Sequence, residues 1–210
     1  DYVNSIPIDR ALDENTLIAF EMNGAPLPHY NGAPARLVVP GWTATYWVKH
    51  LSEIRVEPKP FDGFWVAKAY RVPKGAFPGD RFITQENAET VPITQILVNA
   101  MITSHENGAR IARGQPAVVK GWAWDGGSGI KAVDVSHDGG KTWRPALLDR
   151  DLGRFAWRGF SVPVDTSKSG RRTVAIRATA NNGARQADTL VPNASGYHHN
   201  IIQVLTLEVA

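Results

Sequence analysis

The second half of the chain consists of short β-rich runs separated by glycine turns, and this pattern restricts the fold more than any other feature of the sequence. The runs occupy residues 117–124, 130–136, 154–164, 171–180 and 200–209. The turns between them include Asp125-Gly126-Gly127, Asp138-Gly139-Gly140 and Asn181-Asn182-Gly183, residue types that adopt positive φ with little strain. Runs of this length and spacing predict a β-sandwich over residues 93–210.

Residues 1–92 have a different sequence pattern, because prolines and glycines divide them into short apolar runs. A strand is predicted at 17–22, before the turn Asn23-Gly24, and a second apolar run at 35–39 ends at Pro40-Gly41. No single periodic pattern is long enough to build a core. We therefore expect residues 1–92 to be the last piece of a larger domain.

The rest of this first half gives weaker predictions. Residues 47–51 suit one or two helical turns, and residues 52–56 suit a further strand. The proline-rich stretch 58–92 has no lasting period, so we expect an extended connector on the surface of something larger.

Composition excludes several classes of function. The formal net charge is +3 with the basic residues scattered along the chain, which does not favour nucleic-acid binding, and no apolar run is long enough to span a membrane. The chain has no cysteine, so it has no disulfide, no thiolate metal ligand and no cysteine nucleophile. It opens at Asp1 without Met or a leader pattern, and we expect it to be processed or truncated.

Two motifs suggest chemistry but favour a structural interpretation. Residues 136–143 (SHDGGKTW) match the Asp-box pattern, in which Asp138 accepts hydrogen bonds from the turn and Trp143 folds over the hairpin. A catalytic propeller would need several copies, and the sequence has one. His198 and His199 would point to opposite faces of a strand, so they are not expected to bind one metal; one would pack and the other would face a cleft.

Several segments resemble, in order, those of the sulfite oxidase family. Residues 2–11 (YVNSIPIDRA) resemble Y-x-x-S-I-P-L-x-x-A, and residues 19–28 (AFEMNGAPLP) resemble A-Y-E-M-N-G-x-P-L-P. Residues 32–41 (GAPARLVVPG) resemble G-x-P-x-R-x-V-V-P-G, and residues 48–54 (VKHLSEI) resemble V-K-W-L-x-x-I. Residues 120–143 resemble the opening strands of the family's dimerisation domain. The family carries a hairpin of the Asp-box type there, which accounts for the Asp-box match at 136–143.

The resemblance implies a mostly β chain with two parts. Residues 1–92 would be the C-terminal segment of the α+β molybdopterin-binding catalytic domain, and residues 93–210 would be the immunoglobulin-like dimerisation domain. The implied enzyme is a bacterial sulfite dehydrogenase, a sulfite:cytochrome c oxidoreductase, located in the periplasm. It would use a molybdenum-molybdopterin cofactor, pass electrons to a c-type cytochrome, and form a homodimer.

The resemblance also implies two catalytic residues. Tyr2 matches the family's active-site tyrosine, whose phenol hydrogen-bonds at the substrate position. Near the end of the chain, residues 193–200 resemble the tail that brings a cation towards the substrate, but Ser195 stands where the animal and plant enzymes have Arg. A protonated His199 would supply the missing charge, which would make anion binding depend on pH.

The family's molybdenum-ligating cysteine lies upstream of the Tyr2 motif, so this chain by itself should be inactive and need an upstream catalytic segment as partner. Because the tail at 193–200 differs from the family pattern, a sulfane dehydrogenase of the same fold is an alternative function. Eukaryotic nitrate reductase also shares the architecture, and we rank it as a less favoured alternative. An alternative of another class is a non-catalytic immunoglobulin-like assembly module.

Overall fold

The chain forms two compact units in a computed structural model that describes residues 2–74, 89–190 and 195–210. Unit 1 comprises Asp1–Ile96 and Val191–His198, and unit 2 comprises Leu97–Leu190 and His199–Ala210. The sequence prediction placed one boundary between residues 92 and 93. The structure differs in adding a late segment of the chain to unit 1, so the polypeptide passes between the units more than once.

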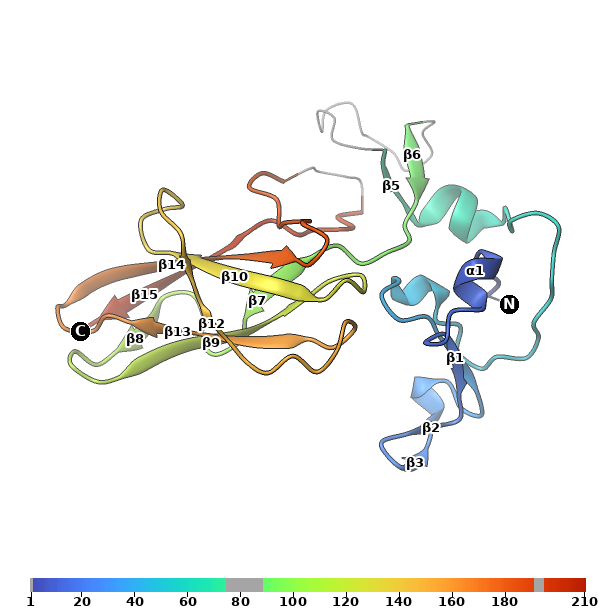
Figure 1. Cartoon of the computed structure of the whole chain (residues 1–210), viewed down its shortest axis with the longest axis horizontal. Coiled ribbons are helices and arrows are strands. Elements are labelled where there is room, and N and C mark those ends of the chain that lie inside the picture. The colour runs from blue at the N-terminus through green and yellow to red at the C-terminus, as the bar shows by residue number, and fades with distance from the viewer. Residues whose placement is uncertain (1, 75–88, 191–194) are drawn as a thin grey trace. The chain divides into compact units, whose positions relative to one another are not determined.

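Unit 2 is built from two β-sheets. The first, in the order β11-β10-β14-β15-β8, is antiparallel except for the parallel pair β15 and β8, and the second has the order β12-β13-β9-β7 and is antiparallel (Figure 1). The strands are β7 (Asn99–Ile102), β8 (Ala109–Ile111), β9 (Ala117–Trp124), β10 (Ile130–Ser136), β11 (Arg144–Pro145), β12 (Leu147–Leu148), β13 (Arg158–Val164), β14 (Gly170–Ala180) and β15 (Gln203–Val209).

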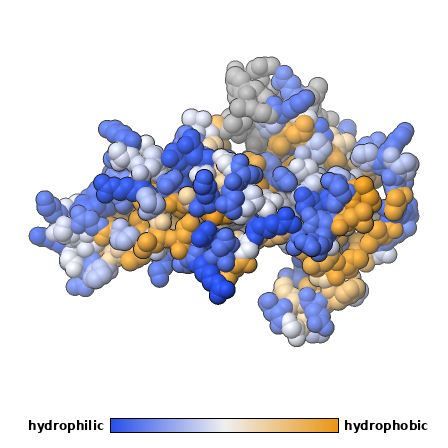
Figure 2. Space-filling view, viewed as in Figure 1, coloured by the Kyte–Doolittle hydropathy of each residue, from blue (hydrophilic) through white to orange (hydrophobic). Residues whose placement is uncertain are grey.

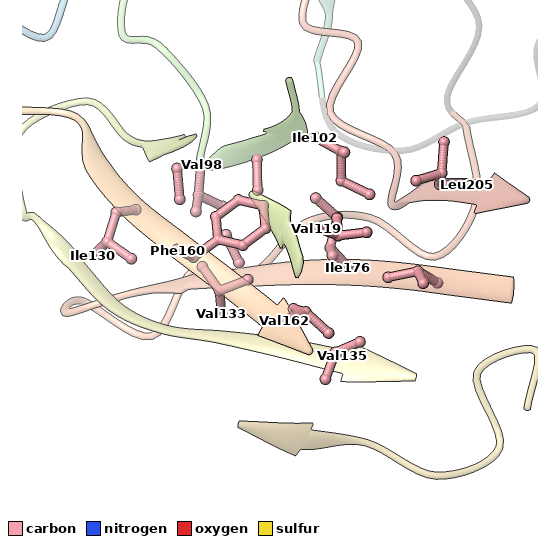
Figure 3. Close-up of a cluster of buried hydrophobic side chains, with 14 of the residues drawn as sticks. Val98, Ile102, Val119, Ile130, Val133, Val135, Phe160, Val162, Ile176 and Leu205 are labelled. Atoms are coloured by element: carbon pink, nitrogen blue, oxygen red, sulfur yellow. The ribbon is translucent and has the colours of Figure 1, made fainter. Parts of the chain in front are cut away.

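The core of unit 2 lies between these two sheets. On β14, Val174, Ile176 and Ala178 are fully buried at every second position, as a period of two requires. They meet Val119 of β9 and Phe160 of β13 from the other sheet, in one hydrophobic cluster (Figure 3). The predicted sandwich is therefore confirmed, because each sheet contributes one apolar face to a shared interior.

The strand predictions in this half hold at most positions. The predicted strands 117–124 and 130–136 coincide with β9 and β10. Two strands start later than predicted, since β13 begins at Arg158 instead of 154 and β15 begins at Gln203 instead of 200. The residues that precede each strand form turns and loops, which an apolar pattern alone does not distinguish from strand.

Unit 1 has short elements and a small core. It contains α1 (Ile8–Ala11), 3-10 turns at His29–Asn31 and Ala44–Tyr46, a π-helix at Trp65–Ala69, and the strands β1 (Leu17–Ala19), β2 (Glu21–Met22), β3 (Ala25–Pro26), β4 (Arg36–Val38), β5 (Arg71–Pro73) and β6 (Thr90–Pro92). The strands pair as β1 with β4, β2 with β3 and β5 with β6, each antiparallel. Its buried cluster consists of Val39, Trp42 and Tyr46, with Ile6, Leu37 and Trp47 packed against it.

Several predictions for unit 1 are wrong. The single strand 17–22 is two strands, β1 and β2, and the helical turns predicted at 47–51 lie earlier, at Ala44–Tyr46. His50 has a left-handed backbone with φ 53°, which is incompatible with continuing a helix.

Two further segments also differ from the prediction. The strand predicted at 52–56 is an exposed coil without ladder partners, with Val56 88% exposed. The connector predicted at 58–92 contains the π-helix Trp65–Ala69 and the paired strands β5 and β6; residues 75–88 of it lie outside the described residues. In the part of the chain that the structure describes, no helix is long and apolar enough to cross a membrane.

The Asp-box hairpin of unit 2 has the structural role that the sequence predicted. Asp138 Oδ1 accepts hydrogen bonds from the backbone N–H of Lys141 at 3.0 Å and of Thr142 at 2.9 Å, and Asp138 Oδ2 accepts one from Thr142 Oγ1 at 2.6 Å. Trp143 Nε1 donates to the Gly140 carbonyl at 2.9 Å. Hydrogen bonds from Thr142 and Ser136 hold the pKa of the Asp138 carboxyl well below its usual value.

The depressed pKa of Asp138 makes a prediction about acid unfolding. Because the folded state binds this proton less tightly than the unfolded state, the contribution of Asp138 is present above the usual aspartate pKa of about 3.9 and is lost as the pH falls below it. We expect Asp138→Ala to lower the melting temperature of the protein by a constant amount above about pH 5. The difference from wild type should shrink below about pH 4, measured by thermal melts across the acid range. An equal difference at all pH values would contradict this.

Candidate active site

Tyr2 is tied to the 3-10 turn at Ala44–Tyr46. Its hydroxyl donates a hydrogen bond to the Thr45 carbonyl at 2.5 Å, and Asn4 Nδ2 donates to the same carbonyl at 2.9 Å. The Asn4 amide also donates to the Tyr2 hydroxyl at 3.4 Å. The extended backbone before α1 therefore places the phenol beside the turn that follows the motif at 32–41. The motifs at 2–11 and 32–41, far apart in the sequence, thus come together at Tyr2.

Aromatic rings surround Tyr2 on one side. The Trp65 ring centroid lies 6.0 Å from that of Tyr2, and Trp65 stacks on Tyr70 at 5.4 Å. Tyr70 in turn lies 6.0 Å from Tyr197, which belongs to the part of the late segment placed in unit 1. No sequence pattern predicted this row of rings, because Trp65 and Tyr70 fall in the stretch that was expected to be a connector.

The protonation state of Tyr2 follows from this environment. Partial burial raises the pKa of the Tyr2 phenol, the hydrogen bond from Asn4 opposes the rise, and the charge of ionised Tyr70 adds to it. The phenol therefore stays protonated at neutral and moderately alkaline pH. It can act as a proton donor towards an anion, provided that its bond to the Thr45 carbonyl is exchanged.

Two buried donors in unit 1 have no partner in the described structure. These are Nε of Arg36, whose other nitrogens donate to the carbonyls of Asn31 at 3.0 Å and Trp47 at 3.4 Å, and Nε1 of Trp42. A buried N–H without an acceptor costs about 1–3 kcal/mol.

His199 does not share a unit with Tyr2. Its side chain is exposed, its backbone carbonyl accepts a hydrogen bond from Asn99 Nδ2 at 3.1 Å, and it belongs to unit 2. The two predicted catalytic residues are thus held by different units. Ser195, at the position of the family's arginine, is exposed, and residues 193 and 194 of the predicted tail lie outside the described residues.

His198 is a candidate to which the sequence assigned no catalytic role. It belongs to unit 1, is half-buried, and has a left-handed backbone with φ 56°. Its Nε2 atom is buried without a hydrogen-bond partner. Burial lowers the pKa of His198, and a hydrogen bond with the Gln95 backbone opposes this, so the ring is neutral at physiological pH.

The two histidines partly match their prediction. One packs and the other is exposed, but both lie in a turn region before β15 and not on a strand. Within the described ranges, no three side chains of the His, Cys, Asp and Glu types gather as a metal site would require.

Comparison with known proteins places this geometry in a family. The model of the oxidoreductase molybdopterin binding domain matches residues 1–65, which hold Tyr2, Thr45 and Arg36, and the model of the Mo-co oxidoreductase dimerisation domain matches residues 90–207. The chain belongs to the sulfite oxidase family. Its likeness to this family of molybdopterin oxidoreductases extends over both units.

Individual relatives cover nearly the whole chain. Human mitochondrial sulfite oxidase is 34% identical over 199 residues, which is 91% of this chain and 36% of that protein. A nitrate reductase of Brassica napus is 30% identical over 220 residues, 95% of this chain and 24% of that protein. The crystal structure of the sulfane dehydrogenase SoxCD from Paracoccus pantotrophus matches this chain with a TM-score of 0.77 and 26% sequence identity. The match covers 99% of this chain and 54% of the chain in that structure. The chain thus spans about a third of the human relative.

Proposed function

We propose that this chain is part of a molybdenum-dependent sulfite dehydrogenase that oxidises sulfite to sulfate and passes the electrons to a c-type cytochrome in the periplasm. The observation that carries the proposal is the placement of Tyr2. Its phenol is protonated, fixed between Thr45 and Asn4, and lies within the segment that matches a molybdopterin-binding domain. A phenol held in this position can orient and stabilise a small oxyanion once its proton is exchanged from the Thr45 carbonyl to the anion.

The residues of this chain fit the edge of a molybdenum cofactor and not its metal. The sequence has no cysteine to ligate molybdenum, whereas the buried nitrogens Arg36 Nε and Trp42 Nε1 lack acceptors of the kind that a pterin or added polypeptide would offer. When bound, the cofactor supplies oxygen-atom transfer and takes up two electrons. Tyr2 would orient the oxyanion, and the rings of Trp65 and Tyr70 would keep water from one side of the phenol.

Unit 1 needs an upstream catalytic segment as its partner. Many large apolar side chains of unit 1 are exposed to solvent, among them Ile8, Leu12, Phe20, Tyr30 and Phe64. Figure 2 shows apolar side chains gathered on the surface of this unit. A monomeric protein rarely leaves so much apolar surface uncovered, so these side chains support a larger domain that continues beyond unit 1.

A tyrosine variant tests the catalytic role in the complete protein. We expect Tyr2→Phe to lower kcat/KM for sulfite about 5- to 150-fold, because one hydrogen bond to a charged oxygen, worth about 1–3 kcal/mol, is lost. The measurement is sulfite-dependent reduction of cytochrome c, together with the molybdenum content of both proteins.

The matched control is Tyr30→Phe, a change at an exposed tyrosine of the same unit, which should leave kcat/KM unchanged. Equal activity of Tyr2→Phe and wild type, at equal molybdenum content, would remove Tyr2 from the site. Absence of any sulfite-dependent reduction by the wild-type protein would overturn the sulfite assignment itself.

A second candidate is a sulfane dehydrogenase. Two observations favour it: the SoxCD structure covers 99% of the chain, and Ser195 replaces the arginine expected beside a sulfite site. A protein-bound persulfide presents less charge than sulfite, so it needs less cation at the site. Parallel assays with both substrates separate the two, because the preferred substrate should show the higher kcat/KM.

A further inference from the structure

A single π turn sets the position of the ring that lies beside Tyr2. The π-helix Trp65–Ala69 ends at the Tyr70 N–H, which donates to the Trp65 carbonyl at 2.8 Å. In an α-helix, residues five apart lie about 140° apart around the axis, because the helix has about 3.6 residues per turn. The i→i+5 hydrogen bond of the π turn instead brings Tyr70 back over Trp65, and the two rings stack at 5.4 Å with an interplanar angle of 22°.

Arg71 fastens the π turn to the neighbouring strand β6. Its Nη1 atom donates to the Val66 carbonyl at 3.0 Å, while Nε and Nη2 donate to Oγ1 and the carbonyl of Thr90, each at 2.8 Å. Thr90 is 4% exposed, and the Ile93 N–H donates to the Tyr70 carbonyl at 2.9 Å. Hydrogen bonds thus reach the start and the end of the turn, so the stacked pair has little freedom to move.

The segment that carries Tyr2 meets this part of the chain at two points. The ring centroids of Trp65 and Tyr2 lie 6.0 Å apart, with an interplanar angle of 44°. The Ser5 hydroxyl accepts a hydrogen bond at 3.0 Å from the Phe61 N–H, shortly before the turn. At the other end of the tyrosine side chain, the hydroxyl is bonded to the Thr45 carbonyl. Trp65 therefore limits the positions that the ring can take when the hydroxyl leaves this carbonyl.

The π turn is an uncommon element for a segment that only connects two others. π-Helices are rare in soluble proteins and occur frequently at functional sites. Trp65 is 38% exposed and lies outside the buried cluster of Val39, Trp42 and Tyr46, so its ring is not held in place for the core of unit 1. An unusual local conformation that the surroundings fix in this way is a reason to look for a functional role.

We propose that Trp65 is a positioning residue of the proposed reaction. Held by the π turn, its ring keeps the Tyr2 phenol aimed at the bound oxyanion when the proton is exchanged from the Thr45 carbonyl. The inference rests on the proposed function, because it assigns a role to Trp65 only where Tyr2 donates to the substrate. Trp65 acts through the Tyr2 ring and supplies no hydrogen bond to the anion.

The same contact shields the phenol from water. Partial burial is the main cause of the raised pKa of Tyr2. Among the described residues, two titratable groups interact with the phenol: Tyr70 from the end of the π turn and Tyr46 from the 3-10 turn. Loss of the Trp65 indole would expose the phenol, so the pKa of Tyr2 should fall towards its usual value.

The test compares Trp65→Leu with Trp65→Phe in the complete protein. We expect Trp65→Leu to lower kcat for sulfite about 10- to 100-fold with little change in KM, because a misplaced donor loses its orientation in the transition state. Trp65→Phe keeps an aromatic ring against Tyr2 and should restore most of the lost rate. Trp157→Leu, the same change at an exposed tryptophan of unit 2, should match wild type.

A spectroscopic readout does not depend on turnover. The absorbance change of tyrosinate is recorded in an alkaline titration of each protein. Subtraction of the same protein carrying Tyr2→Phe isolates the signal of Tyr2. In Trp65→Leu this signal should appear at lower pH than in wild type, whereas in Trp157→Leu it should not move.

The outcomes separate this inference from the proposed function. If Tyr2→Phe lowers the rate but folded Trp65→Leu keeps the kcat and the Tyr2 titration of wild type, Trp65 does not position the phenol and the inference is wrong. If Tyr2→Phe has the activity of wild type, the proposed function fails and the inference with it. If Trp65→Leu and Trp65→Phe lose activity only in proportion to their loss of molybdenum, Trp65 has a structural role, which also contradicts the inference.

Discussion

A Gln186→Leu variant is expected to lose about 2–6 kcal/mol of unfolding free energy in unit 2, which is a large share of the 5–15 kcal/mol typical of a domain. Gln186 is 1% exposed, and its amide replaces backbone pairing that the sheets do not provide. Oε1 accepts from the Ala178 N–H at 2.7 Å, while Nε2 donates to Asn99 Oδ1 at 2.9 Å and to the Ile201 carbonyl at 3.2 Å.

The cost follows from what a leucine would leave behind. The buried Ala178 N–H and the part-buried Ile201 carbonyl would lose this partner, and a buried group left without a hydrogen bond costs about 1–3 kcal/mol. Leucine has nearly the volume of glutamine, so the loss would come from polarity and not from a cavity. The amide also holds Asn99, whose Nδ2 binds the carbonyl of His199, so the backbone at His199 should loosen as well.

Chemical denaturation and hydrogen exchange measure the two effects of Gln186→Leu. The unfolding midpoint should fall, and the amides at 199–203 should exchange faster than in wild type. Gln115→Leu, a change at an exposed glutamine, should stay within about 0.5 kcal/mol of wild type. A Gln186→Leu protein as stable as the Gln115→Leu control would show that the buried amide is not needed.

Local sequence patterns predicted unit 2 well and unit 1 poorly, for a physical reason. Strands β9 and β10 were predicted at their observed bounds because their alternation reports directly on a core that lies within the chain. The strand predicted at 52–56 is an exposed coil with no ladder partner among the described residues. A short β-rich run predicts a strand reliably only where a neighbouring strand pairs with it, and the run itself does not reveal that neighbour.

The candidate site was only partly accessible to sequence reasoning. Tyr2 was found through its motif, and the structure gives it partners in Asn4 and Thr45. The association of Tyr197 and His198 with unit 1, and the burial of Gln186, depend on contacts between residues far apart in the sequence. The assignment of catalytic roles to Tyr2 and His199 stays a prediction, and His198 joins them as a residue to test.

The largest effect of a single added methyl group is expected at Gly121 of β9. A Cβ atom there would lie 2.1 Å from the Met101 carbonyl oxygen and 2.5 Å from Cζ of Phe160, the residue opposite it on β13. Phe160 is among the largest fully buried side chains of the core. Overpacking costs about 1–3 kcal/mol or more, and we expect Gly121→Ala to reach about 3 kcal/mol because one of the clashing atoms is backbone.

A double-mutant comparison separates the two clashes at Gly121. Phe160→Leu makes room for the ring contact but leaves the Met101 carbonyl in place, so Gly121→Ala should remain destabilising in the Phe160→Leu background. Gly108→Ala, where an added Cβ meets nothing but φ is 82°, measures backbone strain alone and should cost about 1 kcal/mol. If Gly121→Ala unfolds at the denaturant concentration of wild type, the packing between β7, β9 and β13 is wrong.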